Sequence, residues 1–205
     1  MPDTALMKLI RSIVAGDDAL AARLLTENPA LARARFEQGA TREAASDSWF
    51  EEITHYVYAG DTALHMAAAA YRPGIVRKLV DMGADVRAKN RHNAEPLHYA
   101  ADGMPGSRGW NPAAQAMTIA CLIEAGADPN ARDKRGVAPL HRAVRTRCAA
   151  AVRALLDGGA NPGLKNKHGS AAILLATQNT GRGGSGSPEA KAQQQQIVAL
   201  LRAAQ

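Results

Sequence analysis

The chain has 205 residues, of which 46% are hydrophobic, 21% charged and only 4% aromatic. This length suits one or two domains or a short repeat array, and the charged fraction of an ordinary globular protein excludes wholesale disorder. With so few aromatic residues, we expect a core of Ala, Leu, Ile and Val, which suits closely packed helices. The net charge of +6 either favours acidic partners or only keeps the chain soluble.

The cysteine content and the apolar segments indicate the compartment. Cys121 and Cys148 are too few for a disulfide framework, and neither lies in a metal-binding spacing. The N-terminal apolar run at residues 6–15 contains Lys8 and Arg11, so it lacks the uninterrupted core of a signal peptide. No stretch approaches the length of a membrane span. We therefore expect a cytoplasmic chain without membrane association, and the Ala- and Arg-rich composition favours a bacterial source.

Two short motifs recur along the chain. The first is GDTALHMA at residues 60–67, NAEPLHYA at 93–100, GVAPLHRA at 136–143 and, more faintly, GSAAILLA at 169–176. Its first and second copies are 33 residues apart, as are its third and fourth, and the middle interval of 43 contains ten extra residues. The second motif, Gly-Ala-Asp or Gly-Ala-Asn, begins at residues 83, 126 and 159, so it keeps the same register. Two markers in register predict an array of structural repeats.

These motifs resemble the ankyrin repeat, whose pattern is a Gly-x-Thr-Pro-Leu-His-x-Ala opening and a Gly-Ala-Asp close at a period of 33 residues. The resemblance implies an all-α solenoid of helix-turn-helix units joined by β-hairpin loops, with about five repeats including degenerate caps. It also implies that His65, His98 and His141 tie adjacent units together by hydrogen bonds. The residues agree with this fold, because Pro96 and Pro139 suit the first helical turn, where a missing N–H costs nothing.

The turn residues also agree with the register. A glycine precedes the first helix of three units, where a positive φ is expected, and Asn93 takes the same place in the second unit. Other glycines are expected to end the second helices: Gly83, Gly126 and Gly159. Because each unit is too small to bury its apolar face alone, the stacking of units supplies the core.

The register divides residues 1–205, a single domain, into six segments. They are an N-terminal capping repeat (1–32), an elongated hairpin or finger (33–59), a repeat (60–89), a repeat with an inter-helix insertion at 104–113 (90–132), a repeat (133–165) and a C-terminal capping repeat (166–205). Aromatic and β-branched residues predict strand character near 52–58. A Gly/Ser-rich insertion at 181–193 is expected to be flexible. Residues 193–196, all Gln, are expected on the polar face of the last helix.

The sequence contains no recognisable catalytic motif: no Gly-x-Ser-x-Gly, no P-loop and no His-Glu-x-x-His. The repeat histidines lie one unit apart and cannot converge on one metal ion, and Glu51 and Glu52 would point to opposite faces of a strand. We therefore predict a non-enzymatic chain without a metal or a cofactor. A redox role for Cys148 is the alternative, because Arg145 and Arg147 could lower the pKa of its thiol.

The family resemblance implies that hairpin tips and the exposed side of the first helices line a concave binding groove. By register, a stripe of basic residues runs along three repeats and ends at Tyr58 and the aromatic finger. Arg and Tyr are favoured at protein interfaces. We predict partner contacts at ten residues: Tyr58, Arg91, His92, Asp102, Trp110, Lys134, Arg135, Arg145, Lys167 and His168.

The leading functional hypothesis is a monomeric adaptor, scaffold or modulator that binds another protein with an acidic surface. Nucleic-acid binding through the basic stripe is an alternative, which Asp61, Asp102 and Asp133 disfavour because they interrupt the stripe in the sequence. A homo-oligomeric structural protein, assembled through the finger and the insertions, is another. An enzyme would need a site within these irregular insertions.

Overall fold

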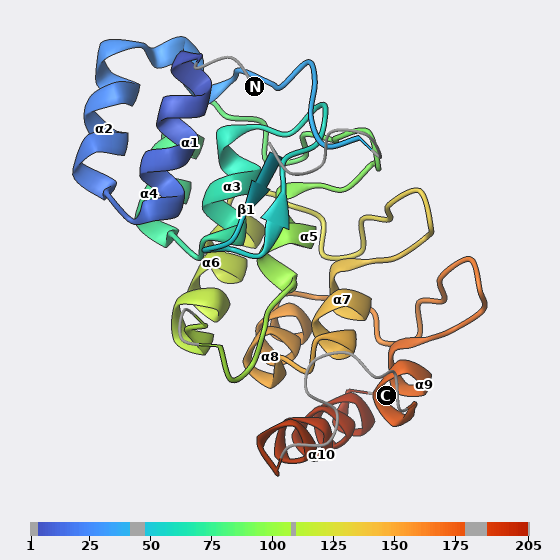
Figure 1. Cartoon of the computed structure of the whole chain (residues 1–205). Helices are drawn as coiled ribbons and strands as arrows, with labels where there is room; N and C mark the ends of the chain where they lie inside the picture. Colours follow the sequence, from blue (N-terminus) through green and yellow to red (C-terminus); the bar gives the residue numbers. More distant parts are fainter. Residues whose placement is uncertain (1–3, 42–47, 108–109, 179–187, 205) are drawn as a thin grey trace.

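In a computed structural model of the chain, the described residues form ten α-helices, which are arranged in two layers (Figure 1). The structure describes residues 4–41, 48–107, 110–178 and 188–204. The first layer contains the inner helices α1 (Ala5–Ala15), α3 (Ala63–Ala69), α5 (Pro96–Ala101), α7 (Pro139–Arg145) and α9 (Ala172–Thr177). The second contains the outer helices α2 (Asp18–Glu27), α4 (Pro73–Asp81), α6 (Pro112–Glu124), α8 (Ala149–Asp157) and α10 (Pro188–Ala203). A 3₁₀ turn, η1 (Pro29–Ala32), follows α2.

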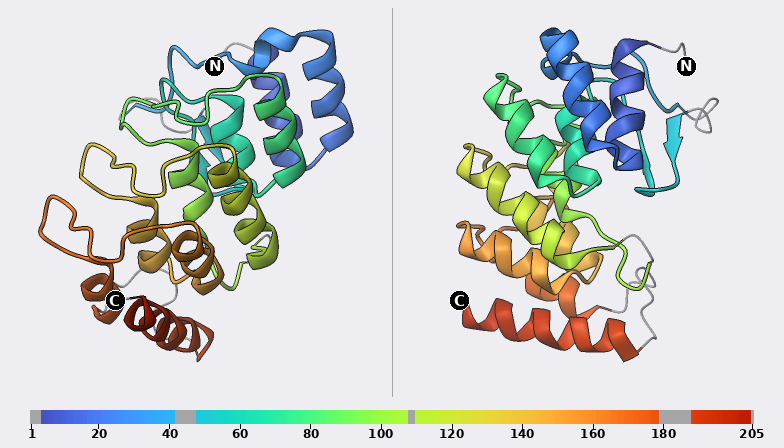
Figure 2. Two further views of the ribbon diagram at one scale, coloured as in Figure 1. Left: turned by 180° about the vertical axis from the view of Figure 1, so that it is seen from behind. Right: turned by 90° about the vertical axis from the view of Figure 1, so that its left-hand side faces the viewer.

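Each inner helix packs on the next inner helix and on the outer helix that follows it in the chain. The five helix pairs therefore stack in sequence order into a curved array (Figure 2). Long loops leave the array along one edge, where the repeats are joined (Figure 1). This arrangement confirms the predicted solenoid of helix-turn-helix units.

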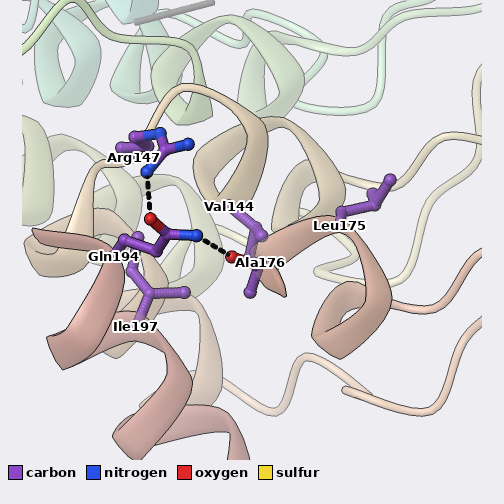
Figure 3. A pocket seen from close by; sticks show the side chains of 6 residues that line it. All are labelled: Val144, Arg147, Leu175, Ala176, Gln194 and Ile197. Atoms are coloured by element: carbon purple, nitrogen blue, oxygen red, sulfur yellow. Dashed lines mark hydrogen bonds between the residues drawn. The ribbon is translucent and has the colours of Figure 1, made fainter. Parts of the chain in front are cut away.

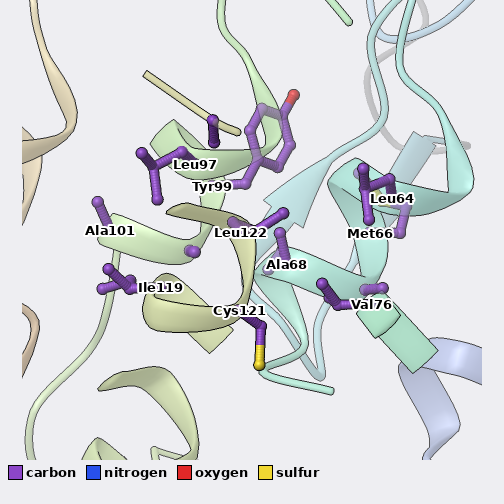
Figure 4. Packing of buried hydrophobic residues seen from close by; sticks show 14 of the residues in the cluster. Leu64, Met66, Ala68, Val76, Leu97, Tyr99, Ala101, Ile119, Cys121 and Leu122 are labelled. Carbon is purple, nitrogen blue, oxygen red and sulfur yellow. The ribbon is translucent and has the colours of Figure 1, made fainter. Parts of the chain in front are cut away.

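The core runs through the whole array between the two layers. Leu64 and Leu97 from inner helices, together with Leu79 and Leu122 from outer helices, are fully buried (Figure 4 shows three of these leucines). Alanines of the inner helices, such as Ala68, are buried as well and leave room for neighbouring helices to approach closely. Burying a leucine or isoleucine side chain stabilises the fold by roughly 1.5–3 kcal/mol, so a continuous core stabilises units that could not fold alone.

The backbone at the repeat turns has the expected left-handed conformation. The glycines that precede the inner helices have positive φ, and Asn93 has φ +56° at the same position of the second unit. The glycines after the outer helices also have positive φ, between +83° and +96°. A side chain is disfavoured in this region of φ, which explains why glycine and asparagine occupy these positions.

The repeat histidines connect each unit to the next. The Nδ1 atom of His98 accepts the backbone N–H of Glu95 at 3.1 Å, and its Nε2–H donates to the carbonyl of Val137 in the next unit at 3.1 Å. His65 makes the equivalent bonds to Thr62 and Ala94. Both rings are fully buried. Their partners require a neutral imidazole with its proton on Nε2.

Residues 33–59 fold back onto the array. Strands β1 (Trp49–Phe50) and β2 (His55–Tyr56) form an antiparallel hairpin in which Trp49 pairs with Tyr56. Residues 51–54 are the turn and β2 ends at Tyr56, so the strand expected near 52–58 is correct only for residues 55–56. Val57 is buried, and its carbonyl accepts the N–H of Ala40 at 2.8 Å. Residues 42–47 lie outside the described part of the chain.

The last helix contradicts two sequence expectations. Helix α10 begins at Pro188, so residues 188–193 extend a helix instead of continuing a flexible insertion; residues 179–187 lie outside the described part. Of the glutamines expected on the polar face, Gln195 and Gln196 are exposed, but Gln193 and Gln194 face the array. Gln194 accepts from Arg147 at 2.6 Å and donates to the Ala176 carbonyl at 2.7 Å (Figure 3). The polar face therefore forms part of the contact between units, because glutamine satisfies polar groups at the array end.

The buried histidines predict a pH-dependent stability. Burial, with a smaller effect of nearby Arg142, lowers the pKa of His98 to about 3, and burial lowers the pKa values of His65 and His141. An unfolded histidine titrates near pH 6.5, so the unfolded chain binds more protons below that pH. As the pH is lowered from about 6 to 3.5, we expect the free energy of unfolding to fall by about 1.4 kcal/mol per pH unit for His98 alone.

Urea denaturation at a series of pH values between 8 and 4 measures this effect. The variant His168→Asn is the control, because His168 is exposed at a loop tip and should leave the profile unchanged. A stability that stays constant from pH 6.5 to 4.5 would contradict the buried neutral histidines.

Candidate interaction surface

Backbone hydrogen bonds join the hairpin tips of successive units. Arg91 N–H donates to the Ala59 carbonyl at 2.7 Å, and Lys134 N–H donates to the His92 carbonyl at 2.9 Å. Lys167 N–H donates in the same way to Arg135 at 3.1 Å. Since each tip is bonded to the one before it, the tips of the second, third and fourth units are held side by side.

Exposed cationic and imidazole side chains cover these tips. We call this surface the basic tips and define it by six residues that are all exposed: Arg91, His92, Lys134, Arg135, Lys167 and His168. The backbone hydrogen bonds between successive tips hold them in place, so these side chains project from one ordered edge of the array. Their electrostatic field favours an acidic ligand.

The carboxylates that interrupt the basic stripe in the sequence are turned inward. Asp61 is 0% exposed, and its oxygens accept from the Tyr99 hydroxyl and from the Asn90 amide, each at 2.9 Å. The Asp133 side chain is 9% exposed and pairs with Arg142 at 3.3 Å. The expectation that these two residues break up the stripe is therefore wrong, because positions in the sequence do not show where the side chains point.

Aromatic rings continue the basic tips onto the hairpin. The guanidinium of Arg91 lies 4.9 Å from the centre of the Tyr58 ring, and the His92 ring meets Tyr58 edge-on at 4.6 Å. Tyr56 lies 6.2 Å from Tyr58 and 4.6 Å from Trp49, which is 40% exposed. The aromatic face and the cations thus form one continuous surface, of the residue types that are enriched in protein interfaces.

An ionic network attaches the hairpin to the inner helices. Asp102 accepts from Arg142 at 2.7 Å and lies 3.7 Å from Nε2 of His55 on β2. Although burial alone would raise the pKa of Asp102, the attraction of Arg142 and the proximity of His55 hold this pKa well below its usual range. The structure therefore places Asp102, a predicted partner contact, in an internal ion pair with 24% of its side chain exposed.

Tyr99 lies at the centre of this attachment. The His55 ring stacks on it with the centroids 4.6 Å apart, and its hydroxyl donates to buried Asp61. Burial, followed by the nearby Asp61, raises the pKa of Tyr99 well above its ordinary value, so the phenol stays protonated. Tyr99 and Arg142 both follow a repeat histidine directly. The repeat pattern allows any residue at the position after the histidine. A large polar side chain there is the signal that could have identified Tyr99 and Arg142 from the sequence.

Two predicted contacts, Arg145 and Trp110, lie away from the basic tips. Arg145 is the last residue of α7, and it lines a cavity with Trp110 and Thr146 at the ends of the inner helices that are remote from the tips. The indole N–H of Trp110 donates to Gln115 at 2.9 Å. Arg145 therefore does not belong to the basic stripe, because the inner helix separates it from the tips.

The comparisons with known proteins agree with this architecture. The sequence model described as "Ankyrin repeat" matches residues 59–91, and the one described as "Ankyrin repeats (many copies)" matches residues 122–176. The chain is an ankyrin-repeat protein. Repeats of this family generally act as protein–protein interaction modules and typically have no enzymatic activity. A search of curated proteins gives no significant match.

The described part of this ankyrin-repeat protein contains no cluster of three or more His, Cys, Asp or Glu side chains that could hold a metal ion. None of its described helices is long and apolar enough to cross a membrane. The surroundings of Cys148 also disagree with the redox alternative, which requires a lowered thiol pKa. Burial raises the pKa of its thiol to about 11, and Arg147 turns to Gln194 instead of to the sulfur.

Replacing Tyr99 tests the internal network of the ankyrin array. Tyr99→Phe removes a hydrogen bond to a buried carboxylate, so we expect the free energy of unfolding to fall by about 1.5–3 kcal/mol. Urea denaturation measures the loss. Tyr56→Phe is the matched control, since Tyr56 lies on the half-buried face of the hairpin and should change stability by less than about 0.5 kcal/mol. Equal effects of the two substitutions would show that the Tyr99 hydroxyl contributes nothing special.

Alkylation tests the state of Cys148. In the Cys121→Ser variant, iodoacetamide at pH 8 should modify the folded protein more than about 100-fold more slowly than the urea-unfolded protein, because a buried thiol with a raised pKa supplies little thiolate. Mass spectrometry follows the reaction. Rapid modification of the folded protein would restore the redox alternative.

Proposed function

We propose that this ankyrin-repeat protein binds an acidic segment of a partner protein across the basic tips and the adjoining aromatic face of the hairpin. The observation that supports the proposal best is the series of hydrogen bonds that holds three tips side by side, with their cations exposed and Asp61 and Asp133 turned inward. The partner's carboxylates would pair with Arg91, Lys134 and Lys167.

The aromatic face favours an acidic protein as the ligand over a polyanion that has no apolar side chains. Tyr58 already contacts Arg91 and His92, so its ring fixes these side chains in place at low entropic cost. Trp49, which is 40% exposed, offers apolar contact area beside the charges. A protein segment that contains acidic and apolar side chains could use both parts of the surface.

Nucleic-acid binding is the second candidate, because the inward-facing carboxylates leave the basic tips more continuous than the sequence indicated. The two candidates differ in salt dependence. Neutralising phosphates releases condensed counterions, so the logarithm of a nucleic-acid binding constant would fall steeply and linearly with the logarithm of the salt concentration. Binding to an acidic protein that also buries apolar area would decline less steeply.

A charge-reversal experiment tests the proposal. Wild type and the variant Arg91→Glu, Lys134→Glu, Arg135→Glu, Lys167→Glu are used to capture partners from a nuclease-treated lysate at two salt concentrations. The captured protein is then purified and its affinity for both forms is measured. We expect the variant to bind roughly 100-fold more weakly or worse, since each reversal removes an attraction of the order of 1 kcal/mol.

The matched control reverses four exposed cations on the outer helices: Arg77→Glu, Arg153→Glu, Lys191→Glu and Arg202→Glu. Its change in net charge is identical, so its binding should match that of wild type. Equal losses in both variants would reduce the effect to net charge. Capture from an untreated lysate that is absent from the nuclease-treated one would favour the nucleic-acid candidate.

A further inference from the structure

A cleft lies between the hairpin and the loop that joins α5 to α6. Its volume is about 810 Å³. The turn at residues 51–54 forms one side, the loop after α5 forms another, and the ends of α3, α5 and α7 close the base. Hairpin and loop lie on the same side of the inner helices (Figure 2). Cavities of this size accept a small ligand or a short peptide segment.

The base and one wall of the cleft are apolar. Small residues of the inner-helix ends, Ala69, Ala70 and Gly103, keep the base open. From the loop, Met104 lines the cleft with 46% of its surface exposed, beside half-buried Trp110. These side chains offer contact to an aliphatic chain or to a cation over an aromatic face.

The charge of the cleft is opposite to that of the protein as a whole. Its described lining residues contain three carboxylates, of Glu51, Glu52 and Asp102, and one guanidinium, of Arg145, whereas the whole chain has a net charge of +6. Asp102 is engaged by Arg142 and His55. Glu51 and Glu52 are exposed on the hairpin turn, and the described residues show neither of them in an ion pair. An acidic ligand would be repelled here and a cationic one attracted.

We propose that this cleft is a second binding site, which takes an arginine or lysine side chain from a short segment of a partner polypeptide. The aliphatic stem of that side chain lies on Met104 and Trp110, and its charged group pairs with Glu51 and Glu52. Long cationic side chains combine an apolar stem with a charged head, which matches a cleft with an apolar wall and an acidic rim. The site is independent of the basic tips, whose charge has the opposite sign.

The indole N–H of Trp110 reports directly on the cleft. Because the chain has two tryptophans, a spectrum of the ¹⁵N-labelled protein shows two indole signals, and Trp110→Phe assigns the one of interest. The probes are three capped dipeptides: acetyl-arginyl-leucine amide, its citrulline analogue, which has the same shape without the charge, and its glutamate analogue. We expect the arginine peptide to shift the Trp110 signal saturably, with a Kd of roughly 1 mM.

The citrulline peptide should bind about tenfold more weakly, and the double variant Glu51→Gln, Glu52→Gln should weaken binding of the arginine peptide by a similar factor, because each change removes a charge-assisted pair. The double variant Glu124→Gln, Glu189→Gln is the matched control, with the same change in net charge at exposed sites outside the cleft. It should bind as wild type does.

The proposal is overturned if the Trp110 signal does not move, if the citrulline or glutamate peptide binds as tightly as the arginine peptide, or if Glu51→Gln, Glu52→Gln binds as wild type does. The variant with four reversed charges at the basic tips should keep its affinity for the arginine peptide. Failure at the tips and failure at the cleft are therefore separate results.

Discussion

The hydrogen bond from each repeat histidine to the next unit is the interaction on which the rest of the structure depends. The ring of His98 satisfies the backbone at the start of its own helix and reaches the Val137 carbonyl of the following unit. Because both partners are buried backbone groups, a displaced neighbour would leave a donor and an acceptor unsatisfied, at about 1–3 kcal/mol each. The bond thus fixes the register between units, and the register in turn aligns the hairpin tips.

The hairpin insertion at residues 33–59 changes the surface that this scaffold presents. In the repeat, the residue after the histidine lies on an inner helix and is free to vary. Here Tyr99 and Arg142 occupy that position and hold the hairpin through His55 and Asp102. The hairpin therefore covers part of the inner-helix face that lies between the tips and the cleft.

The periodic features of the fold were predictable because each has a local physical cause that recurs. A positive φ admits glycine or asparagine, so Asn93 could be assigned the turn before its conformation was known. The contacts of the hairpin and of α10 occur once each and leave no period in the sequence. The charge pattern of the sequence also does not show where a side chain points: Asp61 and Asp133 lie next to hairpin tips in the sequence, yet their side chains face the interior. For Cys148, neighbouring arginines in the sequence suggested a low pKa, and burial produced the opposite shift.

The tips and the cleft lie at opposite ends of the inner helices. Helix α7 has 7 residues, so at 1.5 Å per residue it spans about 10 Å between them. A rigid array keeps two surfaces of opposite charge at a constant separation. A partner that engages both must present an acidic and a basic segment at a matching distance, and the second contact then forms at a high effective concentration. Such a pair of sites selects partners by the order of their acidic and basic segments as well as by their charge. A partner that presents the two segments in the reverse order meets repulsion at both sites.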